Sequence, residues 1–77
     1  MSQLQQAINF LKAHHCLSLT PDGVKEQAGL SLTGATLGRK FRAKAQAGIL
    51  LKSYYVNERN EEIATYAYNP DYEVKTQ

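Results

Sequence analysis

Residues 33–52 read TGATLGRKFRAKAQAGILLK, and this stretch decides the fold. It holds five of the nine basic residues of the chain and no acidic residue. Leu37, Phe41 and Ala45 fall on one side of a helical wheel, while the outward side is small and basic. The stretch therefore predicts a basic helix that begins at Thr33 and ends at Gly48, with a strand directly after it.

Two strands are predicted after this helix, because the spacing of the apolar residues changes from that of a helix to that of a strand. The segments are 49–57 and 62–69, and both are rich in aromatic and β-branched residues. A polar turn of residues 58–61 joins them, and Asn69-Pro70-Asp71 ends the second strand. The predicted register pairs Val56 with Ile63, Tyr54 with Thr65, and Leu51 with Tyr68.

Two shorter helices are expected before the basic one. The first runs roughly from Ser2, its N-cap, to His14. The second begins at Thr20-Pro21 and runs to about Ala28, where Gly29 ends it. Segment 16–20 between them is a brief strand or an extended connector. The residues expected to face inward are Leu4, Ala7, Ile8, Leu11 and His15 on the first helix, Val24, Gln27 and Ala28 on the second, and Leu30 and Leu32 after it.

The length of 77 residues indicates one domain, 1–77, with an ordered core of about 2–69 and a polar tail, 70–77. A single cysteine excludes an intramolecular disulfide. The apolar runs are far shorter than a membrane span needs, and the polar start MSQLQQ differs from a signal peptide. We expect a cytoplasmic protein without a membrane partner.

The charges are distributed unevenly along the chain. The formal net charge is +2, but residues 36–52 carry five basic side chains and no acid. Residues 53–77 carry two basic and five acidic side chains. Such asymmetry concentrates positive potential on the predicted third helix, which favours a phosphate-bearing partner. A solvated helix face without a partner explains the same charge run equally well.

The order of helix, short extended piece, two helices and hairpin resembles the winged-helix superfamily. Gly29-Leu30-Ser31 looks like the turn before a recognition helix, and Leu37 and Phe41 stand where that helix carries its inward apolar pair. Residues 47–50, AGIL, resemble the junction into the first wing strand, and 64–66 look like the returning strand. In size the chain resembles very small regulators of fimbrial operons and small phage regulators. The resemblance implies an α+β fold, a three-helix winged helix-turn-helix with a C-terminal β-hairpin wing.

The chain departs from the family pattern in two places. Lys44 stands where many winged helices carry a leucine, so its stem would pack while its ammonium group reaches solvent. The wing tip carries Glu58, Glu61 and Glu62 against Arg59. Three carboxylates are unsuited to lie along a phosphate backbone. We therefore expect the helix, rather than the wing, to contact DNA.

The predicted function is a small sequence-dependent double-stranded DNA-binding protein, a transcriptional regulator with helix 33–47 in the major groove. Arg39 and Arg42 are suited to guanine, and the helix N-terminus to one phosphate. Lys40, Lys44 and Lys52 are suited to further phosphates. Specific recognition is expected to need a homodimer, tandem sites or a protein partner. The candidate DNA-binding residues are Thr33, Ala35, Thr36, Arg39, Lys40, Arg42, Ala43, Lys44 and Lys52.

Two other binding functions stay open. The acidic wing, the low net charge and the exposed tyrosines also suit a winged-helix protein-interaction module, such as a phage-type modulator of a host complex that does not bind DNA. The tyrosines at 54, 55, 66, 68 and 72 could instead stack single-stranded bases, although hairpin tyrosines more often pack across strands.

Residues 14–16, His-His-Cys, have types found in metal and catalytic sites, but the pattern favours neither. Three adjacent residues cannot all converge on one ion, and the chain has no further histidine or cysteine. No orienting third group or oxyanion arrangement accompanies them. We expect no enzyme activity, no metal and no cofactor, with His15 at a core edge and Cys16 buried as a small apolar side chain.

Overall fold

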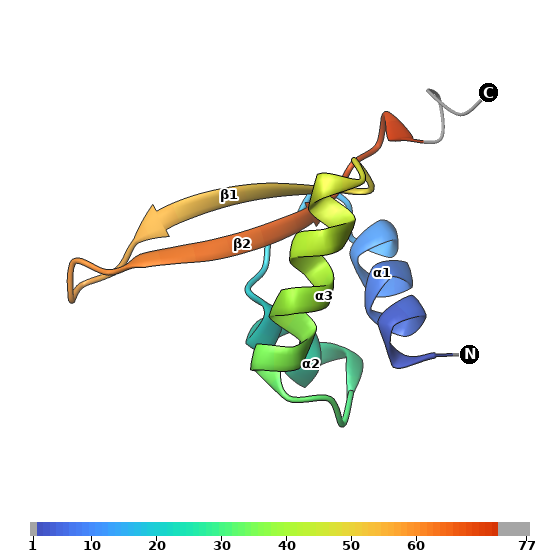
Figure 1. Ribbon diagram of the computed structural model, residues 1–77, viewed down its shortest axis with the longest axis horizontal. Helices are drawn as coiled ribbons and strands as arrows, with labels where there is room; N and C mark the ends of the chain where they lie inside the picture. The colour runs from blue at the N-terminus through green and yellow to red at the C-terminus, as the bar shows by residue number, and fades with distance from the viewer. Residues whose placement is uncertain (1, 73–77) are drawn as a thin grey trace.

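Three helices and a two-stranded antiparallel hairpin follow one another in the computed structural model, which describes residues 2–72. The elements are α1 (Gln3–Ala13), α2 (Pro21–Ala28), α3 (Gly34–Gln46), β1 (Leu50–Val56) and β2 (Glu62–Tyr68) (Figure 1). The predicted α+β order of three helices and a hairpin is confirmed at this level. Of the predicted polar tail, 73–77 lie outside the described residues.

Each helix begins at a hydroxyl side chain that accepts a backbone hydrogen bond, as the sequence predicts. The pairs are Gln5 N–H to Ser2 Oγ at 3.1 Å, Gly23 N–H to Thr20 Oγ1 at 3.0 Å, and Thr36 N–H to Thr33 Oγ1 at 3.2 Å. Pro21 occupies the start of α2, and Gly29 ends that helix in the left-handed region with φ 68°. Glycine adopts this conformation without a Cβ clash, which explains the sharp exit from α2.

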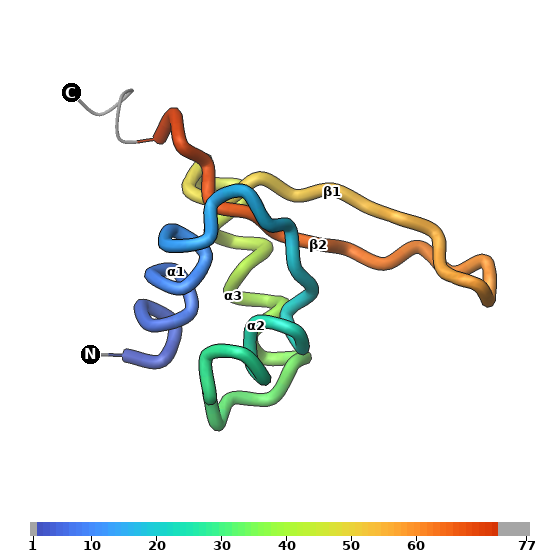
Figure 2. The backbone as a smooth tube through the Cα atoms, turned by 180° about the vertical axis from the view of Figure 1, so that it is seen from behind, coloured from blue at the N-terminus to red at the C-terminus, as the bar shows by residue number. Residues whose placement is uncertain are grey.

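The core lies between the three helices and the part of the hairpin nearest to them (Figures 1 and 2). Ala45 packs against its edge, as predicted. Leu37 and Phe41 are buried in the core, so the predicted inward stripe of α3 is confirmed. The largest fully buried side chains are Phe41, Leu11, Leu37, Leu50 and Val24.

Three predictions of inward-facing residues are wrong. His15 and Cys16 are exposed because α1 ends at Ala13, so the helical wheel does not continue to them. The next residue, His14, already has non-helical dihedral angles, φ −118° and ψ 49°. Gln27 is also exposed, because Val24 and Ala28 supply the inward contacts of the short α2.

The segment between α1 and α2 is an extended connector with a single β-bridge. Leu19 N–H donates to Tyr66 O at 2.9 Å, and Tyr66 N–H donates to Leu19 O at 2.7 Å. Ser18 Oγ donates to Thr65 Oγ1 at 2.9 Å in the same region. The connector therefore runs along the free edge of β2, and of the two predicted alternatives the extended connector is observed rather than the brief strand.

The hairpin register differs from the predicted one by one residue. Ser53 pairs with Thr65 and Tyr54 with Ala64, whereas the predicted partner of Tyr54 was Thr65. The turn is one residue shorter than expected, because Asn57 and Glu61 already pair through Asn57 N–H and Glu61 O at 3.0 Å. A one-residue slip moves every side chain of one strand to the other face. The observed register therefore decides which tyrosines share a face of the hairpin.

The hairpin turn contains a single non-glycine residue in the left-handed region. Asn60 has φ 64°, and its N–H donates to Asn57 O at 3.0 Å. The Asn57 side chain also accepts from Arg59 N–H at 2.9 Å and Glu61 N–H at 3.0 Å. A three-residue loop with a left-handed third residue is one of the common hairpin connections. This three-residue loop explains the observed register.

Candidate nucleic-acid interface

Helix α3 lies on the face of the molecule seen in Figure 1, in front of α2. Its buried side carries Leu37 and Phe41, so the opposite side is free to meet a partner. Arg39, Lys40 and Arg42 are exposed on α3, whose sequence contains no acid. The basic face predicted for this helix is therefore present as an exposed surface.

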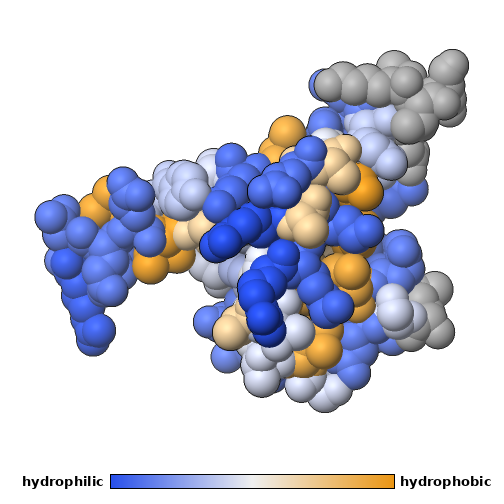
Figure 3. All heavy atoms as spheres, in the orientation of Figure 1, coloured by the Kyte–Doolittle hydropathy of each residue, from blue (hydrophilic) through white to orange (hydrophobic). Residues whose placement is uncertain are grey.

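A shallow hollow of about 330 Å³ lies in the middle of this exposed face. Its lining residues are Thr36, Arg39, Lys40 and Ala43. The short side chains of Thr36 and Ala43 leave space between the longer basic ones. Figure 3 shows hydrophilic side chains gathered over α3 and again at the far end of the hairpin. The hollow gives α3 a surface on which an edge of another molecule can rest close to the backbone.

The first turn of α3 is capped by its own side chains. Thr33 Oγ1 accepts from Thr36 N–H and donates to Thr36 Oγ1 at 2.9 Å. Thr33 and Ala35 are exposed, and Thr36 is half-buried. The hydroxyl group of Thr36, which lines the hollow, therefore already has a hydrogen-bond partner in Thr33.

Asp22 of α2 lies against the start of α3, a contact that sequence reasoning missed. A Cβ atom added at Gly34 would overlap with the Asp22 carboxylate, so this acid sits directly beside the first residue of α3. The carboxylate is therefore placed at the positive end of the α3 dipole, where a negative charge is stabilised. It competes with the phosphate that the sequence analysis expected there.

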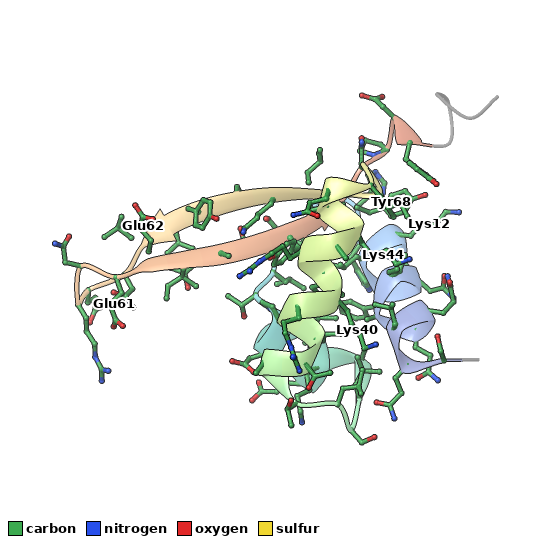
Figure 4. The ribbon with its side chains drawn as sticks, in the orientation of Figure 1. Lys12, Lys40, Lys44, Glu61, Glu62 and Tyr68 are labelled. Atoms are coloured by element: carbon green, nitrogen blue, oxygen red, sulfur yellow. The ribbon has the colours of Figure 1, made fainter. Side chains whose placement is uncertain are left out.

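Lys44 lies on a different side of α3 from the hollow. It lines a cavity of about 230 Å³ together with residues of α1 and the end of β2, among them Lys12 and Tyr68. Figure 4 shows Lys44 between α3 and α1, whereas Lys40 lies lower on α3. Lys12 Nζ lies 5.7 Å from the centre of the Tyr68 ring. Lys44 therefore lies at the flank of the exposed face and does not line the hollow.

Lys52 extends the basic face from α3 onto β1. Its Nζ lies 5.0 Å from the centre of the Tyr54 ring and 6.0 Å from that of Tyr66. A side-chain hydrogen bond with Tyr54 holds the pKa of Lys52 above its ordinary value, although the nearby Arg42 acts in the opposite direction. Arg42 and Lys52 therefore bring positive charge together from a helix and a strand that are adjacent in the fold.

The hairpin acids lie away from α3. Figure 4 shows Glu61 and Glu62 at the far end of the hairpin, remote from Lys40 and Lys44. Glu58, Glu61 and Glu62 are all exposed, as is Arg59. The molecule therefore carries positive charge over α3 and negative charge at the hairpin end. The acids do not interrupt the basic face.

Two tyrosines of the proposed stacking set are exposed and two are buried. Tyr54 and Tyr55 are 58% and 50% exposed, whereas Tyr66 and Tyr68 are 3% and 7% exposed. Tyr72 is half-buried. The buried pair belongs to the core, so a platform for single-stranded bases would consist of Tyr54 and Tyr55, which point to opposite faces of the hairpin.

The His-His-Cys segment does not form a cluster. His14 packs its ring 4.6 Å from that of Phe10, and His15 and Cys16 are exposed. Between residues 2 and 72, no three histidine, cysteine, aspartate or glutamate side chains gather as metal ligands. None of the helices described in that range is long and apolar enough to cross a membrane.

The fold and the exposed basic helix define a small α+β domain whose layout is compatible with a winged helix. No family model matches the chain, and no curated protein or solved structure matches it either.

Proposed function

We propose that this chain is a winged-helix protein that binds double-stranded DNA with α3 in the major groove, as a small cytoplasmic regulator of transcription. The single observation that carries the proposal is the exposed, acid-free face of α3, where Arg39 and Lys40 line a hollow beside Arg42. The major groove admits an α-helix and presents acceptor atoms to such side chains. The role is that of a binding protein, with no enzymatic step and no cofactor.

The candidate DNA-binding side chains divide into those that contact bases and those that contact phosphates. Arg39 and Arg42 suit the two acceptors of guanine, O6 and N7, in bidentate fashion. Lys40 and Lys52 suit phosphates on either side of the groove, and Lys44 suits a phosphate at the flank. Thr33, Ala35, Thr36 and Ala43 are small enough to let the helix backbone approach the bases. The hollow at Thr36 and Ala43 suits a thymine methyl group.

The charges of the molecule set the strength of the proposed binding. The three proposed lysine–phosphate contacts give a slope of log K against log salt of about −2.7. Asp22 beside the start of α3 and the acidic hairpin end both oppose the polyanion. A single copy is therefore expected to bind weakly and to lose much of its affinity between low and physiological salt.

The experiment that tests this function is fluorescence anisotropy with a random-sequence duplex and the matching single strand at two salt concentrations. Duplex binding that weakens at the higher salt supports the proposal. Duplex binding that is absent at low salt contradicts it. A preference for the single strand that is lost in Tyr54→Ala and Tyr55→Ala would instead assign the activity to the hairpin tyrosines.

The alternative function is a protein-interaction module without DNA binding, such as a phage-type modulator of a host complex. One observation favours it specifically: the hairpin combines exposed Tyr54, Tyr55 and Val56 with an acidic end. Exposed apolar groups beside a charged rim are typical of protein interfaces. The same anisotropy titration separates the two functions, because this module would not bind duplex at either salt concentration.

A further inference from the structure

Strand β1 carries most of the large apolar side chains that the fold leaves exposed. Within residues 2–72, four of the five exposed large hydrophobic residues lie on this strand, and the fifth, Leu17, lies on the connector. Each of the four is between 50% and 59% exposed. An edge strand with this composition is a template for pairing with another strand. The four residues are Leu51, Tyr54, Tyr55 and Val56.

The backbone of β1 has an unpaired edge as well. Tyr66 uses its N–H and C=O on Leu19, so its pair with Lys52 is a non-hydrogen-bonded pair of the antiparallel ladder. The N–H and C=O of Lys52 therefore point away from β2, and by alternation so do those of Tyr54 and Val56. The described sheet has two strands: the connector lies along the free edge of β2, whereas no described strand lies along the free edge of β1 (Figure 1).

The far half of the hairpin also lacks support from the helices. In Figures 1 and 2 it extends beyond the helical layer, and Tyr54, Tyr55 and Val56 lie in this half. A two-stranded hairpin alone is only marginally stable in water, and three or more strands with an apolar face are needed. A further strand along β1 would supply this support.

We propose that a second copy of this chain pairs with it through β1, antiparallel and about a two-fold axis at Ser53, to form a four-stranded sheet. In this register Lys52 lies opposite Tyr54 of the second copy, and Leu51 lies opposite Tyr55. The outward N–H and C=O groups of Lys52 and Tyr54 then bond to one another across the axis. Each of the four exposed apolar side chains gains a cross-strand partner.

The distribution of charge favours a second copy of the chain as the partner of the free β1 edge. Antiparallel pairing places the hairpin end of one copy beside the beginning of β1 of the other. In the proposed register Glu58 of one copy lies opposite Gly48 of the other. The hairpin end carries Glu58, Glu61 and Glu62 against Arg59, whereas Lys44 lines a cavity with Ile49, the residue directly before β1. The two ends are therefore complementary, and the complementarity occurs twice in the symmetric pair. The proposed dimer does not rest on DNA binding.

Sedimentation equilibrium over a concentration series tests the dimer. The wild-type chain should approach twice the monomer mass, and Tyr55→Lys should lower its association constant about tenfold or more by placing a charge on the shared sheet. Leu17→Lys is the matched control, since Leu17 is 46% exposed but lies outside β1. Its association constant should match that of the wild type. A wild-type chain that stays monomeric throughout, or equal losses in both variants, overturns the proposal.

A cysteine at the two-fold axis tests the register independently of affinity. The two copies of residue 53 would form a non-hydrogen-bonded pair with Cα atoms about 4.5 Å apart, within the usual range for a disulfide. In a Cys16→Ser background, Ser53→Cys should therefore oxidise to a covalent dimer faster than Gln27→Cys, an exposed position on α2. Equal rates for the two variants would contradict pairing centred at Ser53.

Discussion

Phe41 of α3 and Tyr66 of β2 meet edge to face, with ring centroids 5.3 Å apart and ring planes at 61°. Both side chains are buried, at 0% and 3% exposure. Tyr66 also holds the connector through its two backbone hydrogen bonds with Leu19. One aromatic pair thus joins the basic helix, the hairpin and the connector between the first two helices. This pair fixes the side of α3 that is left to face a partner.

Phe41→Ala should remove a large part of the stability of the fold. Loss of the buried ring and the cavity that it leaves are expected to lower the free energy of unfolding by about 3–5 kcal/mol. A domain of 77 residues has about 4–12 kcal/mol in total. Phe10→Ala is the matched control, because Phe10 is half-buried and packs on the core edge. Urea unfolding followed by circular dichroism measures both. Equal losses in the two variants would contradict the central place of Phe41.

The hairpin turn should depend on the left-handed conformation of residue 60. Asn60→Val puts a β-branched residue at φ 64°, which is expected to cost about 1–2 kcal/mol. Asn60→Gly keeps the same conformation without a Cβ clash and should be at least as stable as the wild type. Thermal unfolding of the two variants checks this. If Asn60→Val melts together with the wild type, the three-residue turn is wrong.

Alanine should stabilise the fold at Gly38 and destabilise it at Gly48. A Cβ at Gly38 would lie 3.6 Å from Pro21 Cγ, an ordinary contact, so the gain in helix propensity of about 1 kcal/mol should be realised. Gly48 has φ 86°, where a Cβ is strained by about 1–2 kcal/mol. Denaturant midpoints of the two variants should therefore move in opposite directions. A loss of stability in Gly38→Ala would mean that α2 and α3 pack more closely there.

Asp22→Asn should raise the affinity for duplex DNA several-fold at low salt. The substitution removes a carboxylate beside the start of α3, the helix proposed to enter the major groove, and so removes a repulsion of the polyanion. Glu58→Gln is the matched control, since it removes the same charge from the hairpin end. Anisotropy titrations at one low salt concentration compare the two. A larger gain for Glu58→Gln would place the hairpin, rather than α3, against the DNA.

The order of the elements and much of the core could be predicted because local chemistry determines them. Hydroxyl caps at Ser2, Thr20 and Thr33 mark the helix starts, and the spacing of Leu37 and Phe41 marks the buried face of α3. These signals lie within a few residues of the structure that they specify. The expectation that α3 has an exposed basic face follows from the same spacing.

The errors arose where a position depends on contacts distant in sequence or on one turn residue. The hairpin register was wrong because a polar turn of three residues and one of four have similar compositions, and the left-handed Asn60 distinguishes them. The contact of Asp22 with Gly34 depends on how α2 meets α3, which no local pattern records. The prediction for His15 is wrong because α1 ends at Ala13, before the position that a helical wheel assigns to residue 15.

The most direct test of the central claim compares two arginine substitutions in duplex binding at low salt. Arg39→Ala removes a side chain from the hollow on α3, and Arg59→Ala removes the same charge from the hairpin turn. We predict that Arg39→Ala weakens binding by about 1–3 kcal/mol and relaxes the preference at one base pair. Arg59→Ala should bind like the wild type. Unchanged binding by Arg39→Ala, or a loss confined to Arg59→Ala, would contradict the claim that α3 is the surface that reads DNA.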